Sequence, residues 1–312
     1  MSINSRKVAI ASAQITLVNE VLPTNRDTSR VPPLVSIVVP VFNGMPHLVT
    51  LTESLLAQSY SNLEIIFSEG GGTDGSMDYI RSITDDRVSI ITQPTGTSAA
   101  QNWTAVTNAA NGDYIKLVCQ DDLLAPFAIE HQLQDLKSHA SAVMAIGQRD
   151  IVDTNGKVIF RNRGCQRLKA GLNKGPHVIR TAYHEGTNVI GEPVAVLFQR
   201  EALIQAMPWN DDNPLVLDLT CYEKVAELGD VVVRKEAVGS FRVSTSSWST
   251  RLAKVQLHQY QAWQKQYEIS ANHDPSPVEK MRAGLGAHLH TSMRRGAYMW
   301  LRMNRSLHSK HD

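Results

Sequence analysis

Two adjacent carboxylates, Asp121 and Asp122, follow a short apolar run from Tyr114 to Val118 after two further residues. Such a run is typical of an interior strand in a parallel sheet that is covered on both faces. Open α/β sheets bind their ligands just outside the carboxyl ends of such strands. Neighbouring carboxylates repel each other, and a hard divalent cation that bridges them to an anionic diphosphate relieves this repulsion. The pair therefore indicates a metal site, and the alternative is an Asp121 that caps the helix expected after Pro126.

A glycine-rich loop from Ser68 to Ser76 is the second candidate for ligand contact. Its glycines allow the backbone to approach a ligand closely, and Glu69 offers a carboxylate to a base or a ribose. The loop follows the strand expected at 63–67 and lies beside the end of the first strand, and this position favours ligand contact. The alternative is a plain turn in which Asp74 caps the helix expected at 76–83.

Three successive β-α units and a fourth strand must position these residues. A β-branched run that begins at Leu34 predicts the first strand, which we expect to stop at Pro40 because proline cannot donate to a ladder. The other strands are expected at 63–67, 88–92 and 114–118. Helices are expected from near Pro46, at 76–83, and from near Ala99 to Asn111-Gly112. Three loops then open onto one edge, which predicts a doubly wound, mostly parallel α/β nucleotide-binding sheet flanked by helices.

The composition is that of an ordinary globular protein of 312 residues. Lys and Arg number 31 against 30 Asp and Glu, so no global field indicates a nucleic-acid partner. Cys119, Cys165 and Cys221 lack the spacing of a zinc site and indicate reduced thiols in the cytoplasm. The amino terminus imitates a signal peptide poorly, and we expect a flexible leader at 1–33.

The order and spacing of six segments between residues 35 and 126 resemble glycosyltransferase family 2. The segments are Val35–Asn43, Glu64-Ile65-Ile66, Gly71–Ser76, Gly96 with Asn102, Ala110–Ile115, and Asp121–Pro126. The resemblance implies a GT-A fold, a nucleotide-diphospho-sugar donor, inversion at the anomeric carbon and a role in polysaccharide biosynthesis.

The resemblance also implies a role for individual residues. Those implied to line the donor pocket are Pro40, Val41, Asn43, Glu69, Gly96, Asn102 and Asp121. Asp122 and Asp121 are the implied ligands of Mg²⁺ or Mn²⁺. The sequence departs from the family pattern at Cys119, where a further aspartate is common, and at Glu69-Gly70, which replaces Asp-Asp. These departures leave the roles of the individual ligands open.

Inversion requires a carboxylate that takes the proton of the acceptor hydroxyl. In the resemblance, Asp218 occupies the position of this catalytic base, and the alternatives are Asp211, Asp212 and Glu192 or a helix-capping Asp218. Arg242 lies in a segment that resembles the closing segment of the family, where a fixed positive charge would steady the departing diphosphate. A structural ion pair is the alternative for Arg242.

Beyond the donor half, a helix is expected at 133–139, a strand at 142–147 and a hairpin around Asn155-Gly156. Residues 161–186 lack a clear period, and we expect a loop over the site or a solvated connector there. An outer strand is expected at 231–235. The predicted domains are 34–250, with a donor-binding half (34–126) and an acceptor-binding, catalytic half (127–250), and a helical extension at 251–312.

The extension is predicted to hold two helices, at 252–267 and from Pro277, where Ser276 and Glu279 form a capping box. The second helix combines an apolar stripe with a basic end. The stripe comprises Val278, Met281, Leu285, Leu289, Met293 and Trp300, and the basic residues are Arg294, Arg295, Arg302, Arg305 and Lys310. Such a helix is suited to an anionic membrane surface. The alternative is a helix packed on the main domain with a solvated basic face.

The leading hypothesis is a metal-dependent, inverting glycosyltransferase that moves a single sugar to a hydroxyl of a glycan or a lipid-linked glycan. The Gln-x-x-Arg-Trp sequence of processive members is absent, which favours single transfers. The predicted location is the cytoplasm, with a peripheral contact at the inner face of the membrane. One alternative is a sugar nucleotidyltransferase, although Phe42-Asn43-Gly44 lacks its basic glycine-rich signature. The other is a non-catalytic protein that binds nucleotide sugars.

Overall fold

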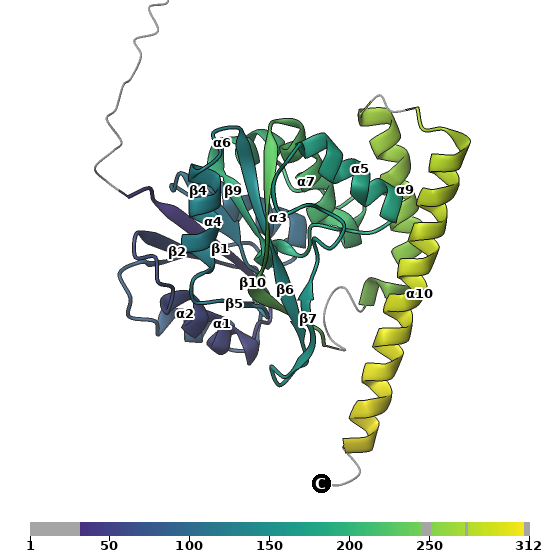
Figure 1. Cartoon of the computed structure of the whole chain (residues 1–312). Coiled ribbons are helices and arrows are strands. Elements are labelled where there is room, and N and C mark those ends of the chain that lie inside the picture. The colour runs from purple at the N-terminus through teal and green to yellow at the C-terminus, as the bar shows by residue number, and fades with distance from the viewer. Residues whose placement is uncertain (1–31, 245–250, 272–273, 309–312) are drawn as a thin grey trace, which may run out of the picture. The chain divides into compact units, whose positions relative to one another are not determined.

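The computed structural model describes residues 32–244, 251–271 and 274–308, and most of the predicted leader lies outside these ranges. Within them, ten strands form one sheet in the order β3-β2-β1-β4-β9-β6-β10-β5, with β7 paired to β6 and β8 to β10 (Figure 1). The parallel strands at one side are β1 (Val35–Val41), β2 (Leu63–Glu69), β3 (Val88–Thr92) and β4 (Tyr114–Leu117). The remaining strands are β5 (Leu123–Leu124), β6 (Ala142–Val152), β7 (Val158–Arg163), β8 (Gly171–Asn173), β9 (Val196–Gln199) and β10 (Asp230–Arg242). The predicted mostly parallel α/β sheet flanked by helices is confirmed.

Helices cover both faces of the sheet because side chains along each strand alternate between two cores. Ile37 and Val39 of β1 belong to one core, and Val38 between them belongs to the other. The helices of the first core are α1 (His47–Leu56), α2 (Ser76–Arg81) and α4 (Ala128–Lys137). Those of the second core are α3 (Ala99–Asn108), α5 (Gly175–Glu185), α6 (Arg200–Ala206) and α7 (Leu217–Glu227).

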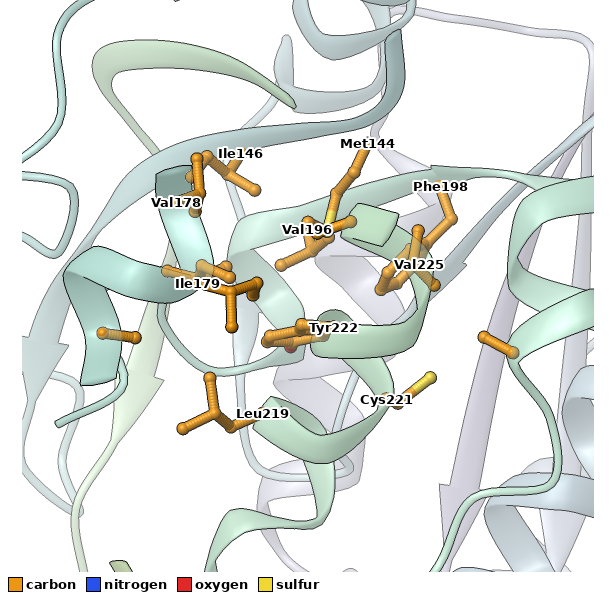
Figure 2. Close-up of a cluster of buried hydrophobic side chains, with 14 of the residues drawn as sticks. Met144, Ile146, Val178, Ile179, Val196, Phe198, Leu219, Cys221, Tyr222 and Val225 are labelled. Carbon is orange, nitrogen blue, oxygen red and sulfur yellow. The ribbon is translucent and has the colours of Figure 1, made fainter. Parts of the chain in front are cut away.

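The second core fixes α7 to the sheet. Figure 2 shows the side chains of α5 and α7 packed with those of β6 and β9. The labelled residues are Met144, Ile146, Val178, Ile179, Val196, Phe198, Leu219, Cys221, Tyr222 and Val225. All ten are buried, so the first turn of α7 is held in a fixed position relative to the carboxyl edge of the sheet.

Two local predictions were wrong. The first strand does not stop at Pro40 but continues to Val41, with Pro40 opposite Ser68 of β2. Val38 faces β4, because its carbonyl accepts from the backbone N–H of Val118. Pro40 is two residues further along β1, so its backbone nitrogen also faces the β4 side, but the pairing with β4 ends at Val38. The proline therefore removes no ladder hydrogen bond.

Residues 161–186 are not a loop, because they contain β8 and α5. The buried residues of α5 include Val178, Ile179, Ala182 and Tyr183, which form a narrow apolar stripe among polar residues. These residues recur at helical spacing and pack against α7, so the segment carries a helical pattern that the loop prediction missed. By contrast, β6 and β7 form the predicted hairpin around Gly156, which has a φ of 81°.

The last two helices are α9 (Gln256–Ser270) and α10 (Pro277–His308). The predicted capping box begins α10: Ser276 donates its N–H to Glu279 Oε2 at 3.0 Å, and Glu279 donates its N–H to Ser276 Oγ at 3.3 Å. Two glycines allow α10 to approach α5 closely. A Cβ on Gly186 would lie 2.1 Å from the backbone nitrogen of Ala287, and one on Gly286 would lie 2.5 Å from the carbonyl oxygen of Glu185.

The described residues from Pro33 onward form one compact unit, and the predicted boundary at residue 250 stays a prediction. No helix in the described ranges is long and apolar enough to cross a membrane.

Candidate active site

The carboxyl ends of β1 and β2 are held together by Asn102 of α3. Its Nδ2 donates to the carbonyl oxygens of Val41 at 3.3 Å and Ser68 at 3.2 Å, and the side chain is buried. A Cβ on Gly70 would lie 3.2 Å from this nitrogen, so glycine relieves a close approach where the family resemblance has an aspartate. Asn102 therefore lies at the predicted donor edge, where it positions two strand ends.

Glu69 and Asn43 shape the glycine-rich loop. The Glu69 carboxylate accepts hydrogen bonds from the backbone N–H groups of Gly71 at 2.9 Å and Gly72 at 2.6 Å. Asn43 has a φ of 52°, and its Oδ1 accepts from the N–H of Thr73 at 2.8 Å. Both side chains thus fix the backbone that would surround a nucleotide, and their direct contact with one stays a prediction.

The remaining donor residues lie on the same side of the sheet. Pro40 and Val41 end β1, and Val41 is fully buried. Gly96 follows β3 with a φ of 90°, and no atom lies within 4 Å of the position that a Cβ would occupy. Asp74 is not the N-cap of α2, which is Gly75. Its carboxylate instead accepts from the backbone N–H of Ser76 at 3.1 Å and from that of Met45 at 2.8 Å, so it joins the glycine-rich loop to the turn after β1.

Asp121 and Asp122 lie in the turn after β4, at the edge where β1 and β2 also end. Asp122 is fully buried; its Oδ1 accepts from the backbone N–H of Arg242 at 3.2 Å, and its Oδ2 has no hydrogen-bond partner in the described residues. Burial raises the pKa of Asp121, and burial together with the charge of Asp121 raises the pKa of Asp122 well above its usual range.

These two carboxylates fit a hard divalent cation. They offer the oxygen ligands that Mg²⁺ and Mn²⁺ prefer, and one of these oxygens is buried without a partner among the described residues. No group of three or more His, Cys, Asp or Glu side chains in the described part of the chain is placed to hold a metal. Further ligand oxygens would therefore have to come from elsewhere, as the oxygens of a diphosphate would allow.

Arg242 ties the turn of Asp121 to the β6–β7 hairpin. Its Nε donates to the carbonyl oxygen of Asp121 at 2.8 Å, and its Nη1 donates to those of Asp153 at 3.0 Å and Thr154 at 3.1 Å. The guanidinium thus binds backbone carbonyls beside the predicted metal site. Its predicted contact with a departing diphosphate stays a prediction.

Asp218 lies in the first turn of α7 and lines a cavity of about 540 Å³, whose wall also includes Asp121. Its Oδ2 accepts from Nδ2 of Asn188 at 2.8 Å, and its Oδ1 accepts from the N–H of Leu219 at 2.7 Å. Burial, reinforced by the negative charge of Glu192, raises its pKa to about 7. A carboxylate with this pKa is divided between its two protonation states near neutral pH, which suits a general base.

The other candidate bases are less well placed. Glu192 also lines the cavity, but it pairs with Arg149 Nε, and the arginine lowers the pKa of Glu192 despite its burial. Asp211 and Asp212 are exposed and do not line the cavity. The geometry therefore favours Asp218 as the carboxylate that faces an acceptor.

Sequence reasoning missed the residues that hold these carboxylates. Asn188 orients Asp218, and its Oδ1 accepts from the backbone N–H groups of Ile190 and Gly191, both at 3.0 Å. Arg149 neutralises Glu192 from β6. Sequence reasoning also missed the contribution of the C-terminal extension to the cavity. His290 and Arg294 of α10 line its wall. The local signal available in the sequence was Asn188 itself, because asparagine side chains commonly accept hydrogen bonds from backbone N–H groups two or three residues further along the chain.

A family model described as "Glycosyl transferase family 2" matches residues 36–206. The chain is 35% identical over 234 residues to an uncharacterized glycosyltransferase of Rickettsia prowazekii, which covers 73% of this chain and 70% of that protein. It is 36% identical over 130 residues to an uncharacterized glycosyltransferase of Haemophilus influenzae and 31% identical over 129 residues to glycosyltransferase GlyG of Streptococcus pneumoniae. These two matches cover 41% of this chain each, and 51% and 43% of the relatives, so the chain spans about half the length of these proteins.

Two solved structures share the fold. TarS 1–349 of Staphylococcus aureus in complex with UDP-GlcNAc matches with a TM-score of 0.59 at 13% identity, over 82% of this chain and 72% of that chain. The mannosyltransferase PcManGT of Pyrobaculum calidifontis, in complex with GDP-Man and Mn²⁺, matches with a TM-score of 0.55 at 14% identity, over 89% and 81% of the two chains. The GT-A type of sheet implied by the sequence is therefore confirmed.

Proposed function

The chain belongs to glycosyltransferase family 2, and from this premise we propose that it transfers one sugar from a nucleotide-diphospho-sugar to a hydroxyl of a glycan or lipid-linked glycan. The observation that carries the proposal is that one cavity is lined both by Asp121, at the predicted donor edge, and by Asp218, a carboxylate with a raised pKa. An enzyme of this class needs both groups within reach of one anomeric carbon. A role in polysaccharide biosynthesis would follow from a glycan acceptor.

Asp218 would act as the general base. As the acceptor oxygen forms its bond to the anomeric carbon, the carboxylate takes the hydroxyl proton, and the bond between that carbon and the diphosphate oxygen breaks. Attack from the face opposite the leaving diphosphate inverts the configuration. Asn188 and the N–H of Leu219 hold the carboxylate in place, so little reorganisation accompanies proton transfer.

Asp121 and Asp122 would hold Mg²⁺ or Mn²⁺ at the donor diphosphate, and the cation would neutralise the charge that grows on the leaving group. The Oδ2 of Asp122, which no described residue contacts by a hydrogen bond, supports this assignment. Arg242, fixed by three carbonyl oxygens, keeps the turn that carries both carboxylates in its position.

The test of the proposal is a thermal-shift panel of UDP, GDP, dTDP and their sugar conjugates with the full chain, with and without Mn²⁺. A ligand that binds only the folded state raises the melting temperature. We expect one nucleotide to raise it by several degrees, and the rise to require Mn²⁺. If no nucleotide raises the melting temperature, the chain has no working donor site and the proposed function is wrong. Turnover that requires a nucleoside triphosphate and a sugar phosphate would indicate a nucleotidyltransferase.

We further propose that the protein works in the cytoplasm and contacts the inner face of the membrane through α10. One side of this helix exposes an apolar stripe, whereas the opposite side packs on α5 through Ala283 and Ala287. Lys280, Arg282 and Arg295 are exposed on the same helix and would attract anionic lipids. The described stripe residues, each more than half exposed, are Val278, Met281, Leu285, Leu289, Met293 and Met299. The predicted contributions of Trp300, Arg302, Arg305 and Lys310 fall on side chains outside the described residues.

The membrane contact predicts co-sedimentation with vesicles that contain phosphatidylglycerol and weaker binding to vesicles of phosphatidylcholine alone. Replacing Leu285 and Leu289 with glutamine should weaken binding at least about tenfold, because both side chains would no longer enter the apolar layer. Ile269→Gln is the matched control, since this residue is 81% exposed on α9 and lies outside the stripe. Equal binding by the double variant and the wild type would refute the contact.

A further inference from the structure

The cavity wall carries two groups of opposite charge. The carboxylates that would face the reacting centre are Asp121, Glu192 and Asp218. The second group comprises Arg163, Arg167, His290 and Arg294. Its residues come from β7 and the segment after it, and from α10, so separate parts of the chain bring three arginines and a histidine to one wall. Burial and the charges of the three arginines lower the pKa of His290, so the positive charge of this group comes from its arginines.

Carboxylates neutralise this basic group only in part. Glu185 lines the same wall and forms an ion pair with Arg167 Nε at 3.2 Å, but it also pairs with Arg282 at 3.2 Å. The guanidinium of Arg163 lies 5.6 Å from the centre of the Phe160 ring, and no described carboxylate lies within ion-pair distance of it. Arg294 is held at the wall by Tyr260 and by Thr187, whose Oγ1 accepts from its Nη2 at 2.7 Å.

Arg149 is a buried donor on the same wall. Its side chain is only 9% exposed, its Nε pairs with Glu192, and its Nη1 has no hydrogen-bond partner in the described residues. The chain makes room for this guanidinium at Gly164, where a Cβ would lie 2.2 Å from Nη1. An unpartnered buried N–H group is costly unless a ligand accepts from it.

We infer that the acceptor carries a phosphate or diphosphate group. The arginines of the basic group, Arg163, Arg167 and Arg294, bind this group while the acceptor hydroxyl lies at Asp218. Guanidinium groups bind phosphate oxygens in pairs of charge-assisted hydrogen bonds, and a cavity of about 540 Å³ has room for a sugar with such a group. The inference rests on the proposed function, because it names the acceptor class of the same site.

The test measures binding to the full chain by titration calorimetry with the donor site filled by Mg²⁺ and the nucleoside diphosphate that the thermal-shift panel identifies. The probes are inorganic phosphate, glucose 1-phosphate and neutral glucose. We expect both phosphates to bind at least about tenfold more tightly than glucose. We also expect Arg163→Gln with Arg167→Gln to weaken phosphate binding by about the same factor.

Arg161→Gln is the matched control, because Arg161 is an exposed arginine on β7 that pairs with Asp150 and does not line the cavity. It should leave phosphate binding unchanged, and nucleoside diphosphate affinity should be unchanged in all variants. The inference would be overturned if glucose binds as tightly as glucose 1-phosphate. It would also be overturned if Arg161→Gln weakens phosphate binding as much as Arg163→Gln with Arg167→Gln does. A wild-type chain that binds no nucleoside diphosphate would instead overturn the proposed function.

A fourth probe, geranyl phosphate, carries the same phosphate group as glucose 1-phosphate and distinguishes the two sources of that group. Tighter binding of geranyl phosphate than of glucose 1-phosphate identifies a lipid-linked acceptor, and the reverse order identifies a soluble sugar phosphate. Either order supports the inference provided that Arg163→Gln with Arg167→Gln weakens the tighter ligand. Binding of both that is indifferent to these two changes would contradict it.

Discussion

Replacing Asp218 with asparagine is expected to lower the turnover number for sugar transfer by about 10²–10⁴-fold, the usual contribution of a general base. Asparagine keeps the size of the side chain but cannot accept the acceptor proton. Nucleoside diphosphate affinity should stay within about twofold of wild type, because Asp218 would contact the acceptor and not the donor. Release of nucleoside diphosphate measures the first quantity, and titration calorimetry measures the second.

Asp211→Asn is the control for this change, since Asp211 is an exposed acid of the same region that does not line the cavity. The amide that Asp218→Asn introduces would face Nδ2 of Asn188, so the melting temperature of the variant must be measured to separate a local fold defect from lost catalysis. Retained turnover in Asp218→Asn together with a large loss in Glu192→Gln would assign the base to Glu192.

The second large effect is expected for Asp121→Asn. Loss of one carboxylate from a two-carboxylate metal site should abolish the Mn²⁺-dependent rise in melting temperature and lower turnover by about 10²-fold or more. Without metal, the melting temperature of the variant should equal or exceed that of wild type, because the Asp121 carboxylate repels the neighbouring, buried carboxylate of Asp122 in the folded state.

Asp113→Asn tests the opposite end of the same strand. The Asp113 carboxylate accepts from the backbone N–H of Leu34 at 3.1 Å, far from the carboxyl edge of β4, and its loss should leave the metal-dependent shift intact. A metal-dependent shift that survives in Asp121→Asn would show that these carboxylates do not hold the cation.

The donor half of the fold was predictable because its signals are local. Strands β1 to β4 are β-branched or apolar runs, and the polar residues that follow them are brought to one edge by the strand order. The capping box of α10 is equally local, since its two residues are three apart. Sequence reasoning therefore placed Asp121 and Asp122 on the correct edge before their contacts were known.

The acceptor half depends on contacts between distant residues. Asn188 reaches Asp218 across 30 positions of sequence, and Arg149 reaches Glu192 across 43. The part of the cavity wall formed by α10 depends on the close approach of this helix to α5, which Gly186 and Gly286 allow. No periodic pattern in the sequence predicts this approach. A helix that reads as an appendage thus became part of the cavity, and its apolar stripe alone could not reveal this.

The pH dependence of kcat/KM for nucleoside diphosphate release, in wild type and Asp218→Asn, tests the central claim most directly. Asp218 is active when deprotonated and burial raises its pKa to about 7. Wild-type kcat/KM should therefore fall about tenfold per pH unit below that value and level off above it. In Asp218→Asn this limb should disappear. A wild-type profile that is flat between about pH 5 and pH 9, or the same limb in the variant, would contradict the assignment of Asp218 as the base.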